Sequence, residues 1–322
     1  MKKSIALAAS AIAAAMLIAP STLAQDYPNR PVRILLGFPA GSSVDIVARV
    51  VGARMSQTLG QQFVVENKPG AGSLLASDTV ARAGKDGYTL LMATVSNTIA
   101  AGLNSHPAVD FRNDFAPIAR LTTTPNILAV HPSVGVKSVK ELIALAKAKP
   151  DSLSIGSSGV GTGTHLAGEL FKLQAGVKMV HVPYPGSPQS VADLVGGRIQ
   201  VLFAPASSVL PQARDGKIVA LAQTEAKRNS AALELPTVQE AGLPGYETGL
   251  WFGLLAPAGT PAAVIDKLNR AANEALKAEE VAKALSPQGI DPIGGSAEEF
   301  TTFIEADVKR WRTVADATGL RK

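Results

Sequence analysis

Two short segments rich in hydroxyl side chains and glycine could bind an anion. Residues 38–45 and 157–165 each follow an apolar run that predicts a buried strand, and each leads into a predicted helix. Free N–H groups at a helix start attract anions. Neither segment contains Lys or Arg, so the attraction would have to come from helix ends and backbone N–H groups. The alternative interpretations are an ordinary capped turn for the first segment and a flexible loop for the second.

The patterns of the common catalytic and nucleotide-binding sites are missing. There is no phosphate-binding G-x-x-x-x-G-K-[ST], and Gly159-x-Gly161 lacks the third glycine of a dinucleotide site. No G-x-S-x-G or H-E-x-x-H occurs, so the serines have no evident activating base. We interpret the four histidines, including His165 at a helix start, as structural. Tyr184 could reach a ligand or simply pack, and Trp251-Phe252 is typical of core.

Composition excludes further classes. The 322 residues include no cysteine, which rules out disulfides, thiolate catalysis and zinc–thiolate sites. The net charge of +5 is dispersed along the chain, whereas a nucleic-acid interface needs clustered charge. Hydrophobic residues make up 46% of the chain, enough for two packed domains. We therefore predict no metal, no cofactor and no nucleic-acid partner.

Strands alternating with helices predict an α/β fold with parallel sheets, in which ligands sit at the carboxyl ends of strands. The predicted strands are 32–38, 63–66, 88–94, 127–131, 154–157, 180–184, 199–204, 218–223 and 250–256, and the predicted helices are 42–59, 73–83, 138–149, 163–173, one starting at 187, 260–276 and one starting at 296. Capping boxes of the form Ser-x-x-Asp/Glu are predicted at Ser42, Ser138 and Ser296. In the last helix, an apolar stripe comprises Phe300, Ile304, Val308, Trp311 and Ala315.

The first 24 residues are predicted to be a secretory signal peptide. Lys2 and Lys3 precede an apolar stretch of 16 residues, and the small residue Ala24 ends the segment. The apolar stretch is short for a membrane span. Cleavage after Ala24 leaves 298 residues with a net charge of +3, because the removed segment carries two lysines. The mature chain is expected to be exported, without insertion into the membrane.

Many short stretches, in order from Tyr27 to about Leu320, resemble the substrate-binding receptors of tripartite tricarboxylate transporters, also called the Bordetella uptake gene family. They include Phe38-Pro39-x-Gly41-x-x-x-Asp45, Val65-Glu66-Asn67-Lys68-Pro69-Gly70-Ala71-Gly72, Asp86-Gly87-Tyr88-Thr89-Leu90, Ser157-Ser158-Gly159-x-Gly161-Thr162-x-x-His165, His181-Val182-Pro183-Tyr184 and Trp251-Phe252-Gly253. One such stretch would be a weak signal, but all of them in order are specific.

The resemblance implies a type II periplasmic binding protein with two α/β lobes, 25–124 plus 233–322 and 125–232, and a ligand cleft between them. Family receptors hold small mono- or dicarboxylates through backbone amides and hydroxyls and deliver them to membrane transporter subunits. A monomer without enzymatic activity is expected. The candidate ligand-binding residues are Phe38, Ala40, Gly41, Ser42, Ser43, Asp45, Thr94, Ser96, Asn97, Ser157, Ser158, Gly161, Thr162, Gly163, Thr164, Tyr184 and Ala204.

Ala204 departs from the family pattern, in which the strand ending at Phe203 is commonly followed by an acidic residue. Alanine cannot pair with a ligand ammonium group, so the departure favours a carboxylate other than an amino acid. Hinges are expected near 122–125 and 232–236. Two alternatives remain open at this point: a secreted α/β hydrolase, and a carboxylate receptor coupled to a sensor kinase.

Overall fold

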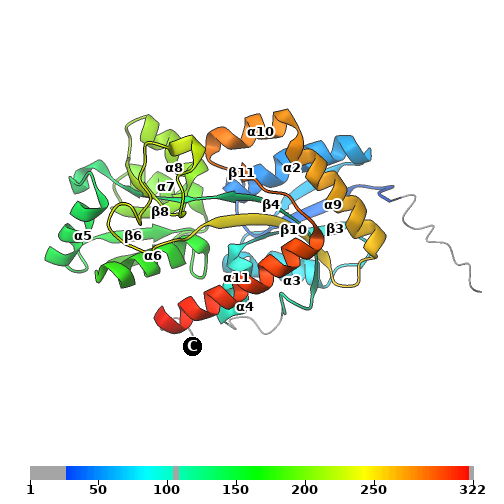
Figure 1. The fold of residues 1–322 in the computed structure, drawn as a ribbon, viewed down its shortest axis with the longest axis horizontal. Coiled ribbons are helices and arrows are strands. Elements are labelled where there is room, and N and C mark those ends of the chain that lie inside the picture. The colour runs from blue at the N-terminus through cyan, green and yellow to red at the C-terminus, as the bar shows by residue number, and fades with distance from the viewer. Residues whose placement is uncertain (1–26, 104–108, 319–322) are drawn as a thin grey trace, which may run out of the picture.

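Two α/β lobes lie side by side, each built around its own β-sheet (Figure 1). The computed structural model describes residues 27–103 and 109–318. The predicted signal peptide, 1–24, and His106 lie outside the described residues.

The sheet of the first lobe has six strands. Their order is β11 (Asp291–Pro292), β4 (Phe115–Thr124), β10 (Leu250–Pro257), β3 (Thr89–Thr94), β1 (Val32–Leu36) and β2 (Phe63–Asn67). The helices packed around it are α2 (Ser43–Leu59), α3 (Leu74–Ala81), α4 (Val95–Leu103), α9 (Ala262–Lys277), α10 (Glu279–Leu285) and α11 (Ala297–Thr318). Figure 1 shows α2, α9 and α10 on one side of this sheet and α3, α4 and α11 on the other.

The second lobe has a five-stranded sheet. Its order is β7 (Val180–Pro183), β6 (Ser154–Ser157), β8 (Val201–Pro205), β5 (Asn126–Val130) and β9 (Val219–Gln223). Its helices are α5 (Val139–Ala148), α6 (Gly163–Ala175), α7 (Ser187–Val195) and α8 (Ala206–Arg214).

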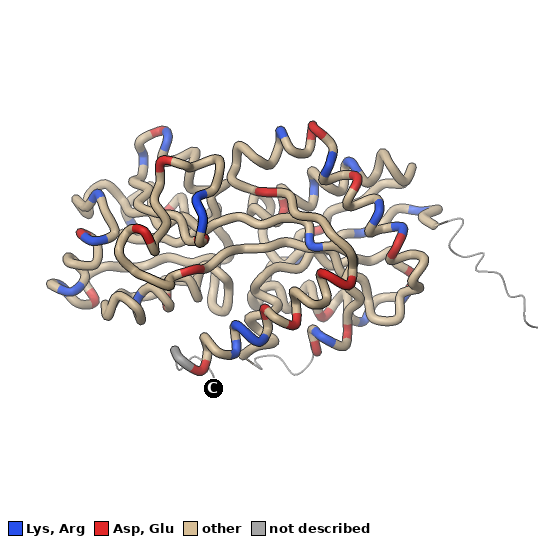
Figure 2. The backbone as a smooth tube through the Cα atoms, viewed as in Figure 1, with Lys and Arg blue, Asp and Glu red and all other residues tan. Residues whose placement is uncertain are grey.

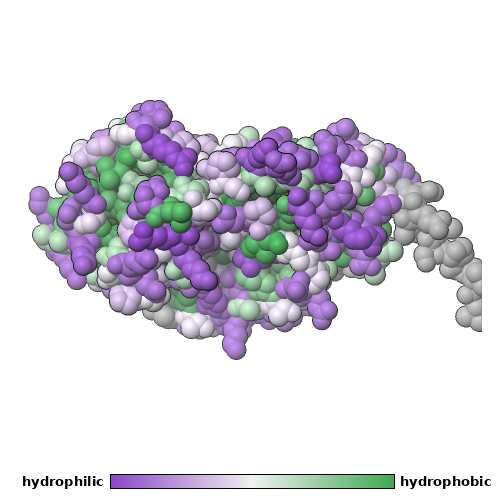
Figure 3. Space-filling model, turned by 45° about the horizontal axis from the view of Figure 1, so that its top comes forward, coloured by the Kyte–Doolittle hydropathy of each residue, from purple (hydrophilic) through white to green (hydrophobic). Residues whose placement is uncertain are grey.

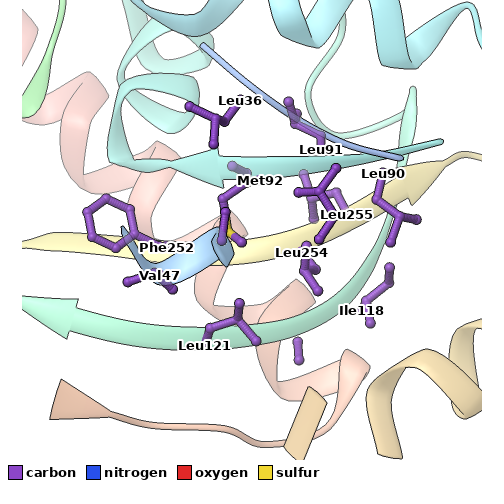
Figure 4. Packing of buried hydrophobic residues seen from close by; sticks show 14 of the residues in the cluster. Leu36, Val47, Leu90, Leu91, Met92, Ile118, Leu121, Phe252, Leu254 and Leu255 are labelled. Atoms are coloured by element: carbon purple, nitrogen blue, oxygen red, sulfur yellow. The ribbon is translucent and has the colours of Figure 1, made fainter. Parts of the chain in front are cut away.

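Aliphatic side chains from the central strands of the first sheet make its core. Leu90 and Leu91 on β3 and Leu254 and Leu255 on β10 are fully buried, and Figure 4 shows them packed together with Met92. Since β1 and β3 are buried on both faces, they are nearly continuous apolar runs in the sequence, which is why they could be predicted.

The sheets are mixed, so the prediction of parallel sheets is only partly correct. β1 pairs in parallel with β2 and β3, and β6 with β7 and β8. In contrast, β10 is antiparallel to β3 and β4, and β5 is antiparallel to β8 and β9. The physical reason is that β5 and β10 are the strands by which the chain enters each lobe. They run away from the crossings, whereas β3 and β8 end near them.

Several elements were not predicted, namely β4, α4, α8, α10 and β11. β4 was missed because Pro117 and Arg120 interrupt its apolar run, although both lie in the strand. α8 contains Pro211, whose usual effect is to end a helix. At the last helix the prediction is confirmed: Ser296 Oγ accepts from Glu299 N, Ser296 N donates to Glu299 Oε2, and the predicted apolar stripe is buried.

The chain crosses between the lobes twice, at neighbouring positions. β4 leads into β5 through Pro125, and Leu250 at the start of β10 pairs with Thr124 at the end of β4. The Thr123 hydroxyl joins the two crossings, lying 3.0 Å from Leu250 O and 2.9 Å from Glu225 Oε1.

Residues 233–249 pack on the second lobe rather than the first, which differs from the boundary expected at 232/233. Val238, Leu243 and Tyr246 belong to the buried cluster around β5, β6 and α6. The Tyr246 hydroxyl donates to Ala167 O on α6 at 2.8 Å. The second crossing therefore lies near Gly249–Leu250, not near 232–236.

Charged and hydrophobic side chains are both dispersed over the surface. Figure 2 shows Lys and Arg interspersed with Asp and Glu over both lobes. In Figure 3, hydrophilic residues cover most of the face turned forward, with smaller hydrophobic areas between them. Among the described residues, no helix is both long and apolar enough to cross a membrane.

Replacing Tyr246 tests whether the 233–249 segment belongs to the second lobe. Tyr246→Phe removes the hydroxyl from Ala167 O in a fully buried setting, and we expect a loss of about 1 kcal/mol in stability. Hydrogen–deuterium exchange should rise in α6 and around Tyr246 while α11 keeps its protection. Faster exchange in α11 instead would indicate that residues 233–249 belong to the first lobe.

Candidate functional site

A cavity lies between the lobes at the starts of several helices. Its fifteen lining residues are Phe38, Ser42, Ser43, Val44, Thr94, Val95, Ser96, Leu250 and Phe252 from the first lobe, and Ser158, Thr162, Gly163, Thr164, Ser187 and Pro205 from the second. Its volume is about 40 Å³, which is room for about three water molecules. Such a small volume means that the lobes are closed on one another.

Five helices direct their N-termini at this cavity. The lining contains the first residues of α2, α4, α6 and α7 and the N-cap residue of α8, Pro205. Each N-terminus carries a partial positive charge and N–H groups that have no partner inside their helix. None of the fifteen lining residues has a charged side chain. The cavity is therefore electropositive through backbone dipoles alone, which suits a small anion.

The loop between β1 and α2 is held by Asp45, which points away from the cavity. Asp45 Oδ2 accepts from Gly41 N at 3.0 Å, and Oδ1 accepts from Asn67 Nδ2 at 2.9 Å. Burial alone would raise the pKa of Asp45, but Arg49, Gly41 N–H and Asn67 together lower it below its usual value. The predicted capping box is wrong here, because Ser42 Oγ donates back to Pro39 O and Asp45 bonds to Gly41 N. The N–H groups at the start of α2 thus stay available to a ligand.

Hydroxyl groups organise the loop between β6 and α6. Thr162 Oγ1 donates to Gly159 O at 2.7 Å and caps α6 by accepting from His165 N. Thr164 Oγ1 accepts from Ser158 N at 2.8 Å. Ser158 Oγ lies 2.9 Å from Ser187 Oγ at the start of α7. These bonds fix two helix starts relative to each other.

A third loop, between β3 and α4, adds Thr94 and Ser96 to the cavity. Thr94 Oγ1 accepts from Ser96 N at 3.2 Å. Asn97 supports this turn from behind, since its Oδ1 accepts from Thr94 N at 2.9 Å and its Nδ2 donates to Ser77.

Contacts between the lobes keep the cavity closed. Ser43 Oγ of the first lobe lies 2.6 Å from Ser207 Oγ of the second. Gly186 packs so close to Pro39 that a Cβ on the glycine would lie 2.5 Å from Pro39 Cγ. Glycine at 186 therefore lets the two lobes approach.

Nine of the predicted site residues line the cavity, namely Phe38, Ser42, Ser43, Thr94, Ser96, Ser158, Thr162, Gly163 and Thr164. Eight do not, namely Ala40, Gly41, Asp45, Asn97, Ser157, Gly161, Tyr184 and Ala204. Ala40 and Gly41 are exposed at the turn. Ala204 is fully buried in the core of the second lobe, so its neighbour Pro205 lines the cavity instead.

Tyr184 borders a second hollow that adjoins the cavity. This hollow, with a volume of about 260 Å³, shares Phe38 and Ser158 with the cavity and is also lined by residues 69–72. The Tyr184 hydroxyl donates to Asp193 Oδ2 at 2.8 Å. Burial and this carboxylate raise the pKa of Tyr184 to about 12, so the phenol remains a donor.

Six lining residues were not predicted, namely Val44, Val95, Ser187, Pro205, Leu250 and Phe252. Ser187 could have been found, since it follows a strand and a glycine and opens a helix, as the other site residues do. Phe252 was interpreted as core, and its neighbour Trp251 is core, with Nε1 donating to the buried Asp307. Successive side chains of β10 point to opposite faces of the sheet, which is why Phe252 lines the cavity and Trp251 does not.

A serine–histidine pair is present that the sequence did not reveal, but it does not line the cavity. Ser157 Oγ lies 2.7 Å from His181 Nε2. Ser157 is 1% exposed and does not line the cavity, so its hydroxyl has no access to a substrate there. The pair therefore lacks the open position that a nucleophile requires.

His165, Glu169 and His181 also form a group whose ligand atoms lie within 4.8 Å of one another. These side chains already have partners in the protein, and His165 Nε2 lies 3.6 Å from Glu169 Oε1 within the group. His165 Nδ1 accepts from Gly161 N at 3.3 Å, and Glu169 Oε1 pairs with Lys172 Nζ at 2.7 Å. With Ser157 on His181, the group is a closed hydrogen-bonded cluster rather than an open set of metal donors.

Comparisons with known proteins agree with this architecture. Residues 47–320 match the model of the tripartite tricarboxylate transporter family receptor. The chain is 35% identical to Protein BugT of Bordetella pertussis over 312 residues, covering 96% of this chain and 95% of that protein.

Solved structures with the same fold include periplasmic binding protein BugD (TM-score 0.88, 31% identity, covering 92% of this chain and 100% of that chain). R. palustris Rpa4515 with adipate gives a TM-score of 0.86 at 36% identity, covering 91% and 99%. MatC from Rhodopseudomonas palustris with bound malate gives 0.85 at 30% identity, covering 89% and 99%.

The two lobes thus have the fold of periplasmic binding proteins, and the receptors of this kind are solute-binding proteins rather than enzymes. The family match extends over most of the described residues, including both lobes and the cavity loops after β3 and β6, and it begins after the loop between β1 and α2. The chain belongs to the tripartite tricarboxylate transporter receptor family.

Proposed function

We propose that this chain is exported to the periplasm, captures a small organic carboxylate between its lobes and delivers it to membrane transporter subunits. The observation that carries the proposal is the convergence of five helix N-termini on a cavity without charged side chains. A carboxylate can accept several N–H and O–H bonds at once, and charge-assisted bonds of this kind are stronger than neutral ones. Family membership supports the delivery step.

The ligand is a mono- or dicarboxylate with an aliphatic or aromatic body. Phe38, Val95 and Phe252 offer apolar walls beside the hydroxyls, so one cavity suits both parts of such a molecule. The relatives solved with adipate and malate support this class. With no acidic side chain among the fifteen lining residues, an amino-acid ammonium group would have no charged partner, which disfavours an amino acid.

Capture proceeds by closure about the two crossings. The ligand enters the open form and bonds to helix starts of both lobes, which favours the closed form. The proposed hinges are Thr124–Asn126 and Gly249–Leu250, where the chain passes between the sheets. The proposed lobes are accordingly 27–124 with 250–318, and 125–249. The receptor acts as a monomer, after cleavage of its signal peptide following Ala24.

A thermal-shift screen of carboxylates tests this function directly. A ligand present at 100 times its Kd adds about 2.7 kcal/mol of stability, which raises the melting temperature measurably. We expect small carboxylates to stabilise the mature protein, and amines and neutral sugars of equal size to leave it unchanged. Stabilisation by sugars or cations alone contradicts the proposal. Tight binding of aspartate, with no binding of dicarboxylates that lack an ammonium group, contradicts the inference that an amino acid is a poor ligand.

Hydroxyl substitutions test the location of the site. Ser158→Ala and Thr162→Ala are each expected to weaken binding of the best carboxylate by about 1–3 kcal/mol, measured by calorimetry. Thr162→Ser keeps the hydroxyl that caps α6 and should bind nearly as well as the wild type. Ser152→Ala is the matched control, because Ser152 is exposed and bonds only locally to Lys149 O. Unchanged affinity in both alanine variants would place the ligand elsewhere.

Gly186→Ala tests the closure. The added methyl group would collide with Pro39 across the cleft, so the variant should stay more open and lose affinity by about 1–3 kcal/mol. Small-angle X-ray scattering with saturating ligand should show a larger radius of gyration than for the wild type. Gly196→Ala is the control at the other end of α7, where the backbone is helical (φ −79°) and the nearest atom is 3.4 Å away. A compact, fully active Gly186→Ala protein contradicts closure at this contact.

A further inference from the structure

Two histidine rings lie directly behind the loop that carries Ser158 and Thr162. His165 is in the first turn of α6 and His181 is on β7, and their ring centroids are 4.2 Å apart with planes tilted by 31°. Neither ring lines the cavity. The pair sits between the loop and the rest of the second lobe.

The rings bond to one side of the loop while its other side faces the cavity. Gly161 N donates to His165 Nδ1 at 3.3 Å, and Ser157 Oγ lies 2.7 Å from His181 Nε2. Gly159 N in turn donates to Ser157 Oγ at 3.1 Å. Residues 157, 159 and 161 are thus held by the histidines, and the intervening Ser158 and the following Thr162 line the cavity.

The support from the rings adds to the loop's own hydroxyl bonds at two glycines whose backbone is little restrained. Gly159 (φ +118°) and Gly161 (φ +77°) both adopt backbone angles that favour glycine, the residue with the greatest conformational freedom. The bonds of the Ser158 and Thr162 hydroxyls orient those two side chains, and the two rings add bonds to the backbone and to Ser157 on the opposite side of the loop.

The bond from Gly161 requires a neutral imidazole at His165, and burial beside that ring favours a neutral imidazole at His181. His165 Nδ1 accepts an N–H bond, so a proton on that nitrogen would face the Gly161 N–H group. The charged side chains that act on the pair are Glu169 and Lys172, both on α6, and they are joined to each other at 2.7 Å. The side chain from β6 that contacts the pair is Ser157, which is uncharged, and the residue from β7 is His181, a member of the pair.

Electrostatics agrees with the geometry. Burial lowers the pKa of His165 despite Glu169, and burial, His165 and Lys172 lower the pKa of His181 to about 4. A histidine whose pKa falls on folding stabilises the fold above its unfolded value of about 6.5, and that contribution is lost as the pH falls toward its folded value. The loop is therefore supported at neutral pH and loses support in acid.

We propose that His165 and His181 are positioning residues, which as a neutral stacked pair hold the 157–162 loop in the geometry that binds the carboxylate. The expected effect on ligand affinity rests on the proposed function. The support of the loop by the histidines does not, because it is a property of the ligand-free protein. It can be measured separately.

Nuclear magnetic resonance of the mature, ligand-free protein tests the support itself. The Gly161 amide signal should shift together with the histidine ring signals as the pH is lowered from 7.5 to 4, and its exchange with solvent should quicken. His165→Asn and His181→Gln each place an amide oxygen where a ring nitrogen accepts, without a titrating group. In the double variant the Gly161 signal should not titrate. A Gly161 signal that is independent of pH in the wild type overturns the proposal.

Binding of adipate, used as the probe, tests the consequence. At pH 7.5, His165→Ala should weaken adipate binding about two- to tenfold, the range for loss of one hydrogen bond, and His165→Asn should restore it. At pH 4, wild-type affinity should fall about twofold relative to the double variant, because a group with a pKa near 4 is half protonated there. Protonation of adipate affects both proteins equally, so it cancels in the ratio of wild-type affinity to double-variant affinity at the same pH.

His131→Asn is the matched control, since His131 is on the same lobe and bonds only to Ser133. It should keep the wild-type pH profile. Identical profiles for the wild type and the double variant, or failure of His165→Asn to restore what His165→Ala loses, overturn the positioning role. If adipate binds neither the wild type nor any variant, adipate is not a ligand of this chain, and the Gly161 titration still decides the role of the histidines.

Discussion

The structure depends on one electrostatic constraint, the meeting of five helix N-termini at a single cavity. Positive helix ends repel one another, so this arrangement carries an unfavourable energy that a bound anion removes. Neutral hydroxyls and buried apolar side chains surround the helix ends, and the cavity has room for only about three water molecules. The field of the backbone is therefore poorly screened, and a lysine or arginine is not needed to attract a carboxylate.

Sheet topology explains how five helices from two lobes can point at one place. In each lobe, parallel strands end at the same edge of the sheet, and the helices that follow β1, β3, β6, β7 and β8 begin at that edge. The two crossings at Thr124 and Leu250 set these edges face to face. Antiparallel β5 and β10 carry the chain across, so the departure from a purely parallel sheet is what places the two binding edges opposite each other.

The sequence predicts what is local and misses what depends on distant contacts. The strand–loop–helix units around Ser42 and Thr162 could be located because apolar runs, hydroxyls and glycines lie next to one another in the chain. Leu250 and Phe252 join the same cavity from a strand far along the sequence, and no local pattern distinguishes them from core. The predicted cap at Ser42 failed for a local reason: Ser42 Oγ donates back to Pro39 O, and Asp45 accepts from Gly41 N, while Asn67 on another strand binds the second carboxylate oxygen. The packing of residues 233–249 on the second lobe likewise depends on a distant contact, because Tyr246 is anchored by α6, which lies about 80 residues earlier.

Ser157 and His181 show why residue types alone do not establish chemistry. At 2.7 Å their geometry is that of a nucleophile and its base, yet the hydroxyl is buried, and it accepts from Gly159 N instead of facing a substrate. The same bond serves binding well, because it fixes the backbone on which Ser158 is presented. Selectivity in a site without charged side chains must come from shape and from the placement of neutral donors. A group that holds those donors in position from outside the cavity therefore contributes to recognition as directly as one that touches the ligand.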